Sequence, residues 1–319
     1  MKITFISQKA PSFIKRDDIH LPVDLAQQCA LKAYNFHYSQ LDALAEQNEN
    51  FDIAILLIPK TGKDREALLN IEIVEKSKNI AKKVWFMQEG PAWIFQDLNL
   101  YQQFWHYNVL SSVDGILCEN ETDIPYFKGL VPNKPVFDIP SVMIEDKILT
   151  AKNIVKQDKV MIGGNFCRWY GGFDSYIIAH EFDVPMFAPS MGRKIEREDD
   201  IENLNHLPFM NWNQWIHTLA EFKYAIHLMP TIAAGTFAMN CGYLGVPCIG
   251  YDQADTQRKI HPELSVKFGD TETARILANK LKTDSEFYLH CSKTAIDNYN
   301  TLFGEKIFLN KMEKRLKTC

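Results

Sequence analysis

The chain has 319 residues, which suits two domains better than one, because single hydrophobic cores stop growing at about 250–300 residues. Its composition is that of an ordinary globular protein, with 46% hydrophobic and 24% charged residues and a formal net charge of −5. The first 148 residues carry 15 Lys and Arg against 20 Asp and Glu, which argues against an extensive nucleic-acid-binding face there, and residues 149–319 carry 20 of each.

Membrane and secretory segments are not expected. No apolar run approaches the ~20 residues that cross a bilayer, and the stretch Met1–Phe13 has too short an apolar core for a signal peptide. We therefore expect a cytoplasmic protein, in the host cytoplasm if the chain is viral. The seven cysteines lack Cys-x-x-Cys spacing, so neither a zinc site nor a disulfide framework is predicted.

The first half alternates short apolar runs with helical patterns, which is typical of a parallel sheet. Strands are predicted at Ile3–Ser7, Ile53–Ile58, Val84–Gln88, Gly115–Glu119 and Val136–Ile139. Helices are predicted between them, at Leu25–Asn35, Arg65–Ile80 and Tyr101–Ser112.

The segment from Pro132 to Asp158 is punctuated by prolines and predicts the crossing between domains, after which the pattern restarts. Further strands are predicted at Lys159–Ile162, Val184–Ala188, Tyr224–Met229, Cys248–Gly250 and Ser265–Lys267, and the last forty residues are helical in propensity. The predicted fold is α/β with two Rossmann-like domains, residues 1–148 and 149–298. Residues 299–319 would form a C-terminal helix that returns to the first domain.

A glycine-rich loop follows the first strand of the second half. It contains Gly163, Gly164, Asn165 and Arg168. Glycines let backbone N–H groups approach a diphosphate, and an arginine adds a charged donor. The alternative is a tight turn with a surface arginine, which would have the same sequence. Arg193 and Lys194 form a second basic pair that either faces phosphate or lies in a solvated loop.

A second loop leads from the Tyr224–Met229 strand into a helix. Thr231, Gly235, Thr236 and Asn240 lie there, and a helix N-terminus favours an anion such as the second phosphate. The alternative is that Thr236 only caps the helix. His227, within the strand, is interpreted as a hydrogen-bonded core histidine.

An acid–amide loop directly follows the next strand. Its residues Asp255, Thr256 and Gln257 carry groups that commonly bind sugar hydroxyls, and a polar turn is the alternative. No convincing Asp-x-Asp pair follows a strand, so no metal is expected.

In the first half, Gln88 and Glu89 end a strand, where a carboxylate could act as a general base. A solvated glutamate in a turn is the alternative. The candidates for binding an acceptor are Gln88, Glu119, Asn120 and the aromatic ring of Trp93.

The stretch HLMPTIAAGTFAMNCGYLGVPCIGY resembles the donor-binding motif of GT-B glycosyltransferases, in which a Pro-Ser loop and a glutamate-bearing helix precede a Gly-Val-Pro turn. This resemblance implies two Rossmann-like domains facing across a cleft, with a nucleotide-diphospho-sugar bound to the second. Retaining members carry two glutamates in an EX7E pattern. Here the second falls on Asn240, so the resemblance favours an inverting mechanism.

Three segments resemble the DNA β-glucosyltransferase family of T-even phages, whose donor is UDP-glucose. KKVWFMQEGPAWIF is similar to a strand-then-carboxylate segment and implies that Glu89 is the base, where the family has aspartate. VMIGGNFCRWYGG is similar to a phosphate loop and implies a role for Arg168; GYDQADTQRKI points to Asp255 and Thr256. Asn240 again stands where that family has a donor-binding glutamate.

The sequence thus predicts a metal-independent, inverting glycosyltransferase that needs no cofactor and moves a sugar from a UDP-sugar to a glycan or a hydroxymethylated DNA base. Three alternatives stay open: a nucleotide-sugar epimerase or hydrolase, a non-catalytic nucleotide-sugar- or glycan-binding protein, and a structural Rossmann-like module. The sequence does not predict an oligomeric state.

Overall fold

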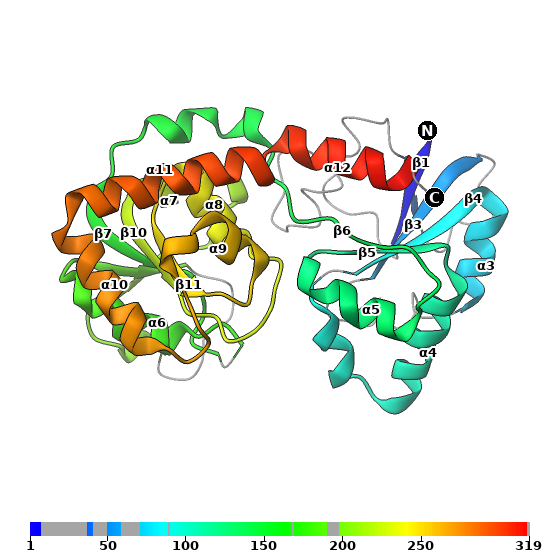
Figure 1. Ribbon diagram of the computed structural model, residues 1–319, viewed down its shortest axis with the longest axis horizontal. Helices are drawn as coiled ribbons and strands as arrows, with labels where there is room; N and C mark the ends of the chain where they lie inside the picture. Colours follow the sequence, from blue (N-terminus) through cyan, green and yellow to red (C-terminus); the bar gives the residue numbers. More distant parts are fainter. Residues whose placement is uncertain are drawn as a thin grey trace. The chain divides into compact units, whose positions relative to one another are not determined.

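The structure is a computed structural model that describes residues 1–7, 37–40 (backbone only), 50–58, 71–88, 90–167, 169–189 and 198–317. The chain divides into two compact units, each built around a parallel sheet (Figure 1). Unit 1 comprises Met1–Val142 and Phe308–Cys319, and unit 2 comprises Met143–Ile307.

The sheet of unit 1 has six strands, all paired in parallel. Their order is β2 (His37–Gln40), β1 (Ile3–Ser7), β3 (Phe51–Ile58), β4 (Ala81–Gln88), β5 (Gly115–Cys118) and β6 (Val136–Asp138). The central strands β3 and β4 are buried along most of their length, which explains their nearly continuous apolar sequences.

Helices cover both faces of this sheet. In the described part of unit 1 the α-helices are α3 (Ile71–Ile80), α4 (Leu100–Ser112), α5 (Ile124–Leu130) and α12 (Glu305–Lys317), with a short 3-10 helix η3 (Ala92–Asp97) before α4. The first three and η3 share one apolar cluster with alternate strand residues such as Phe86. Trp85 points to the opposite face, where its ring stacks on Phe137, and the Arg315 guanidinium of α12 lies over the same Phe137 ring.

The sheet of unit 2 also has six parallel strands. Their order is β12 (Ser265–Val266), β11 (Cys248–Tyr251), β10 (Phe222–His227), β7 (Gln157–Ile162), β8 (Met186–Ala188) and β9 (Leu204–His206). The chain therefore builds outward from β7 in one direction and then, from β10, in the other. This is the doubly wound order of Rossmann-like sheets.

The helices of unit 2 form a layer on each face of its sheet. They are α6 (Gly172–Ala179), α7 (Trp212–Ala220), α8 (Thr236–Leu244), α9 (Asp255–Ile260), α10 (Thr271–Thr283) and α11 (Ser285–Leu302). Side chains of α7 and α8 pack with Met161 and Ala225, whereas side chains of α6 and α10 pack with Val160 and Ile226. Neighbouring strand residues thus face opposite layers, as the two-residue period of a strand requires.

The segments by which the chain enters and leaves unit 2 are joined by hydrogen bonds. The Glu145 carboxylate accepts from the Tyr299 hydroxyl and from the Glu305 backbone N–H, both at 2.9 Å. The Glu305 carboxylate accepts from the Glu145 N–H at 3.1 Å. In unit 1, Arg315 pairs with Asp138 at the end of β6 and holds α12 there.

The predicted α/β class with two Rossmann-like sheets is confirmed, and all ten predicted strands are present with ends shifted by a few residues. The prediction missed β2 and β9, which lie at sheet edges and whose sequences, HYSQ and LNH, contain no apolar run. The predicted helix at Leu25–Asn35 lies outside the described residues, and that at Arg65–Ile80 is described from Ile71 onward as α3.

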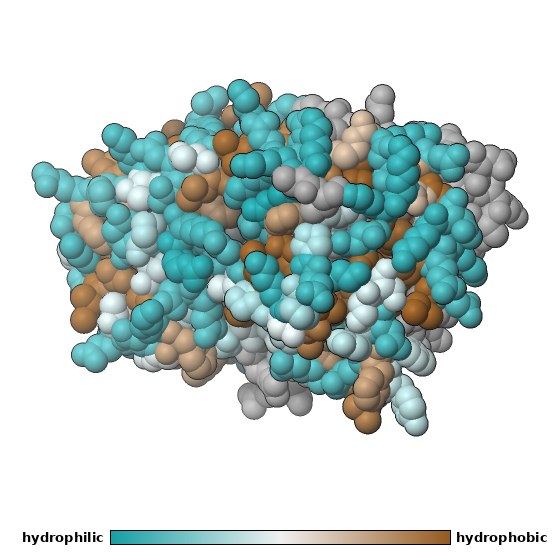
Figure 2. Space-filling view, turned by 45° about the vertical axis from the view of Figure 1, so that its right-hand side comes forward, coloured by the Kyte–Doolittle hydropathy of each residue, from teal (hydrophilic) through white to brown (hydrophobic). Residues whose placement is uncertain are grey.

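Hydrophilic residues dominate the face seen in Figure 2, and apolar residues reach that surface in separate places. Helix α4 contains no Asp, Glu, Lys or Arg. It exposes a set of large apolar and aromatic side chains: Leu100, Tyr101, Phe104, Trp105 and Tyr107. No helix in the described part of the chain is both long and apolar enough to cross a membrane.

His106 of α4 should make the protein less stable in mild acid. Burial lowers the pKa of His106 to about 3, and its ring stacks on Phe95. An unfolded histidine titrates near pH 6.5, so below that pH the unfolded chain binds more protons and stability falls until the folded pKa is reached. We expect a loss of up to about 1.4 kcal/mol per pH unit from His106.

The measurement is chemical denaturation between pH 7 and pH 4.5. His106→Leu removes the titrating group, so its stability should fall less over this range than that of the unaltered protein. His227 and His261, whose pKa values burial lowers to about 4, would leave a residual slope. Identical pH profiles for the two proteins would contradict the expectation.

Candidate functional site

The strand order of unit 2 reverses between the neighbouring strands β7 and β10. In open α/β sheets, ligands bind beyond the carboxyl ends of the strands at such a reversal. The loops that begin there start at Gly163 and Leu228. They carry six of the predicted donor-binding residues: Gly163, Gly164, Asn165, Thr231, Gly235 and Thr236.

The loop after β7 packs closely on two rings. A Cβ on Gly163 would lie 2.5 Å from Phe237 Cδ1 and 2.8 Å from His227 Cγ, and one on Gly164 would lie 2.7 Å from the Tyr170 carbonyl oxygen. The Gly163 N–H completes the pairing with β10 by donating to Ile226 at 2.8 Å. Packing alone therefore requires glycine at both positions, whether or not a ligand approaches.

The two loops are tied together by side-chain hydroxyls. Thr231 Oγ1 donates to the Trp169 carbonyl oxygen at 2.7 Å. Ser175 Oγ donates to the Gly171 carbonyl oxygen and accepts from the Leu228 N–H, both at 2.8 Å. The loop also closes on itself, because the carbonyl of the buried Asn165 accepts from the Gly172 N–H at 3.0 Å. These bonds link the two loops on the side away from Gly164 in the sequence, through residues 165–175 of the first loop and Leu228 and Thr231 of the second.

Two helices begin at this edge without a side-chain cap. Gly171 precedes α6 and Gly235 precedes α8, with φ of 61° and 67°. A Cβ at Gly171 would overlap the Leu228 carbonyl, and one at Gly235 would overlap Thr256 Oγ1. The first turn of a helix presents N–H groups and the positive end of the helix dipole, so this edge is suited to an anion.

Asn240 lies in the second turn of α8 and is buried. With its amide oriented to satisfy both polar atoms, Nδ2 donates to the Thr236 carbonyl at 3.1 Å and Oδ1 accepts from Trp215 Nε1 at 3.0 Å. The side chain therefore joins α8 to α7. No local sequence pattern predicts Trp215 as its partner.

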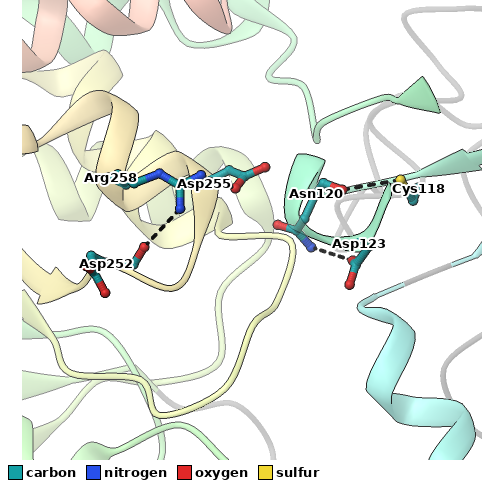
Figure 3. A network of polar contacts seen from close by, with 6 residues as sticks. All are labelled: Cys118, Asn120, Asp123, Asp252, Asp255 and Arg258. Atoms are coloured by element: carbon teal, nitrogen blue, oxygen red, sulfur yellow. Dashed lines mark hydrogen bonds and ion pairs between the residues drawn. The ribbon is translucent and has the colours of Figure 1, made fainter. Parts of the chain in front are cut away.

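The residues of the predicted acid–amide loop form the start of α9 and are buried. Thr256 Oγ1 donates to the Gly235 carbonyl oxygen at 2.9 Å, and Gln257 Nε2 donates to the Cys248 carbonyl oxygen at 2.9 Å. Asp255 forms a 2.8 Å ion pair with Arg258, which also contacts the Asp252 backbone (Figure 3). These bonds anchor α9 to β11 and to the cap of α8.

In unit 1, buried side chains hold the backbone of Gly90 and Pro91, just beyond β4. Gln88 Nε2 donates to the Gly90 and Pro91 carbonyl oxygens, and the Gly90 N–H donates to Glu119 Oε2 at 2.9 Å. Gln88 and Glu119 are both buried. Gly90 has a φ of 85°, which a residue with a side chain rarely adopts. Buried hydrogen bonds therefore hold the described residues on both sides of Glu89.

The loop after β5 completes this support. Asn120 Nδ2 donates to Asp123 Oδ2 at 3.2 Å, and Cys118 Sγ donates to the Asn120 carbonyl oxygen (Figure 3). Asp123 Oδ1 accepts from the Ala92 N–H at 3.2 Å, at the start of η3. Trp93 of η3 is half-buried. Of the predicted acceptor residues, Gln88, Glu119 and Asn120 thus hydrogen-bond within the protein.

Four predicted site residues lie outside the described part of the chain: Glu89, Arg168, Arg193 and Lys194. Their roles stay predictions. Among the described residues, no group of three or more His, Cys, Asp or Glu side chains is arranged to hold a metal ion.

His227 differs from the core histidine that the sequence suggested. Its Nε2 atom is buried and has no hydrogen-bond partner among the residues that the structure describes. His227 ends β10 at the strand reversal, and its ring meets that of Phe237 edge-on, with centroids 5.2 Å apart. A polar residue in the last position of an apolar strand, beside a glycine-rich loop, is the signal that could have identified it.

No protein-family model matches the sequence, and no curated protein sequence matches it either. Solved structures do resemble it over the whole chain. HepE of Anabaena in complex with UDP-glucose matches with a TM-score of 0.68 and 11% identity, covering 100% of both chains. Sucrose-phosphate synthase from Thermosynechococcus elongatus matches with a TM-score of 0.73 and 10% identity, covering 99% of this chain and 98% of that one.

A third similar structure is an alpha-glucosyltransferase in complex with UDP and a 13-mer DNA containing an HMU base. It matches with a TM-score of 0.66 and 10% identity, covering 99% of each chain. Identities this low establish the fold and leave the activity to be argued from the site. The fold is that of the GT-B glycosyltransferases.

Gly235 should be essential for the local structure of the site. Gly235→Ala introduces a side chain at positive φ, which costs about 1–2 kcal/mol from the backbone alone, and its Cβ overlaps Thr256 Oγ1. We expect a melting temperature lower by several degrees. Gly129→Ala is the matched control, because a Cβ at Gly129 in α5 meets nothing within 4 Å. Equal melting temperatures for the two variants would contradict the expectation.

Proposed function

We propose that the chain is a UDP-sugar glycosyltransferase that acts on a hydroxyl group of a glycan, with inversion at the anomeric carbon and without a metal ion. One observation carries this proposal. Predicted donor residues converge on the strand reversal of unit 2, in a fold whose full-length neighbours include proteins solved with UDP or UDP-glucose.

The donor would bind to unit 2 through its diphosphate. The uncapped starts of α6 and α8 supply N–H groups and positive potential at one edge of the sheet. Arg168, with Arg193 and Lys194, would add positive charge. In the transition state the same groups would stabilise the negative charge that develops on the departing UDP, which is the task a metal ion performs in other transferases.

Glu89 would act as the general base. It would remove the proton from the acceptor hydroxyl as that oxygen attacks the anomeric carbon and the bond to UDP breaks. The support is its place in the chain directly after β4, between Gln88 and Gly90, which buried hydrogen bonds hold in place.

The composition of unit 1 supports a glycan over DNA as acceptor. Unit 1, residues 1–142 together with 308–319, carries 18 basic against 19 acidic side chains, and so lacks the excess of positive charge that DNA binding requires. Helix α4 of the same unit exposes uncharged aromatic side chains, which are suited to packing on sugar rings.

Inversion is supported by Asn240. The EX7E pattern of retaining enzymes has a carboxylate at this position, and here the amide is buried and bonded to Trp215 and Thr236. One neighbour is named an alpha-glucosyltransferase, so the anomeric configuration of the product deserves direct measurement. Proton NMR of the product from an α-linked donor should show a β linkage, and an α linkage would overturn this part of the proposal.

The test of the function begins with a thermal-shift screen of nucleotide-sugars. A ligand at 100 times its dissociation constant stabilises a protein by about 2.7 kcal/mol, so UDP-sugars should raise the melting temperature. Radiolabelled UDP-sugars are then offered with oligosaccharides or with hydroxymethylated DNA, and without acceptor. Transfer to oligosaccharides is expected. Transfer to hydroxymethylated DNA alone would show that the acceptor is DNA and not a glycan. Turnover without acceptor would indicate a hydrolase or an epimerase.

Glu89→Gln should lower kcat by roughly 10²–10⁴-fold and leave the affinity for UDP nearly unchanged, because the amide cannot accept the proton. Glu75→Gln, on the exposed side of α3, is the matched control.

Arg168→Ala should instead weaken UDP binding by roughly tenfold or more, through loss of a charged hydrogen bond. Steady-state kinetics and calorimetry separate the two effects, and unchanged turnover in Glu89→Gln would remove Glu89 from the base role.

A further inference from the structure

The last residue of β10 is a histidine at the strand reversal. Tyr224 and Ile226 of β10 face the layer of α6 and α10, and Ala225 faces that of α7 and α8. Alternation along the strand directs His227 to the same side as Ala225, where its ring meets Phe237 in the first turn of α8. The imidazole therefore lies beside the uncapped start of that helix.

The loop after β7 covers the His227 ring. A Cβ on Gly163 would lie 2.8 Å from its Cγ, and one on Gly164 would lie 3.0 Å from its Nε2. The Nε2 atom is buried and lacks a hydrogen-bond partner within the described ranges, although the residue as a whole keeps some exposed surface. The ring thus lies at the boundary of the core, with a polar atom directed toward the glycine loop.

This polar atom is costly for a residue that only packs. An unpaired buried donor or acceptor costs about 1–3 kcal/mol. His261 in the same unit pairs one of its two ring nitrogens, because its Nε2 hydrogen-bonds the Ala238 carbonyl oxygen at 3.0 Å, while its Nδ1 has no partner among the described residues. Burial lowers the pKa of His227 to about 4, so the ring is neutral near pH 7 and carries one N–H donor.

We propose that His227 is a donor-binding residue, whose Nε2–H hydrogen-bonds a phosphoryl oxygen of the nucleoside diphosphate. This inference rests on the proposed function. A diphosphate is favoured over a sugar hydroxyl because the ring adjoins the first turn of α8, where N–H groups and the helix dipole attract an anion. The oxygen takes the position that Gly164 now covers, and a loop without side chains there can shift to admit it.

The test compares His227→Leu with His227→Gln. Leucine fills part of the ring's space and removes the polar atom, so the unliganded protein should melt within a few degrees of the unaltered one. Its dissociation constants for UDP and UDP-glucose should both rise about tenfold or more, whereas uridine binding should be unchanged. Glutamine retains an N–H donor and should restore part of the affinity. Calorimetry measures the first two ligands and NMR titration measures uridine.

His106→Leu is the matched control. His106 is also a buried histidine with a lowered pKa, and its Nε2 likewise has no hydrogen-bond partner among the described residues, but it lies in the core of unit 1. Its replacement should leave UDP affinity unchanged. A comparable loss of affinity in this control would mean that the effect of His227→Leu is not local, and would overturn the inference.

Four other results would also overturn it. Unchanged UDP affinity in His227→Leu would show that His227 makes no hydrogen bond to the diphosphate, and would leave the proposed function intact. A loss confined to UDP-glucose would assign His227 to the sugar, and an equal loss for uridine would indicate collapse of the site. Absence of UDP binding by the unaltered protein would overturn the proposed function and this inference with it.

Discussion

The candidate site depends on the lack of room for side chains where β7 and β10 end. The two loops and the two helix starts touch one another through backbone atoms, so a Cβ would collide with a ring, a carbonyl or a hydroxyl. Five positions share this constraint: Gly163, Gly164, Gly171, Gly172 and Gly235. Because glycine also occupies the cap positions of α6 and α8, no side chain there satisfies the first-turn N–H groups. Close packing of the backbone thus produces an edge suited to an anion.

Unit 1 uses buried polar side chains for a related purpose. Glu119 and Asp123 accept hydrogen bonds from the backbone N–H groups of Gly90 and Ala92, and Gln88 donates to carbonyls of the same turn. Buried carboxylates are costly unless they are well hydrogen-bonded, so these side chains are committed to holding the turn.

The fold was largely predictable because apolar runs and turn residues mark parallel strands that are buried on both faces. Strands β2 and β9 were not predicted, because short edge strands need no apolar run. In the site, spacing located the loops but could not reveal the direction of each hydrogen bond. The polar groups of Asn240 and Gln257 suggested ligand contacts, yet they join α8 to α7 and α9 to β11. Such pairings depend on residues far apart in the chain, which local patterns do not encode.

A glycine-rich loop after a strand is therefore ambiguous evidence for a ligand. The Phe237 and His227 rings and the Tyr170 carbonyl already account for Gly163 and Gly164, so a protein that bound nothing would need the same residues. Groups that packing leaves unused are more informative. The Nε2 atom of His227 is buried without a partner in the described chain, beside a helix start that no side chain caps. His106 has the first feature without the second, whereas at His227 the two coincide, and a hydrogen-bonded anion would satisfy both.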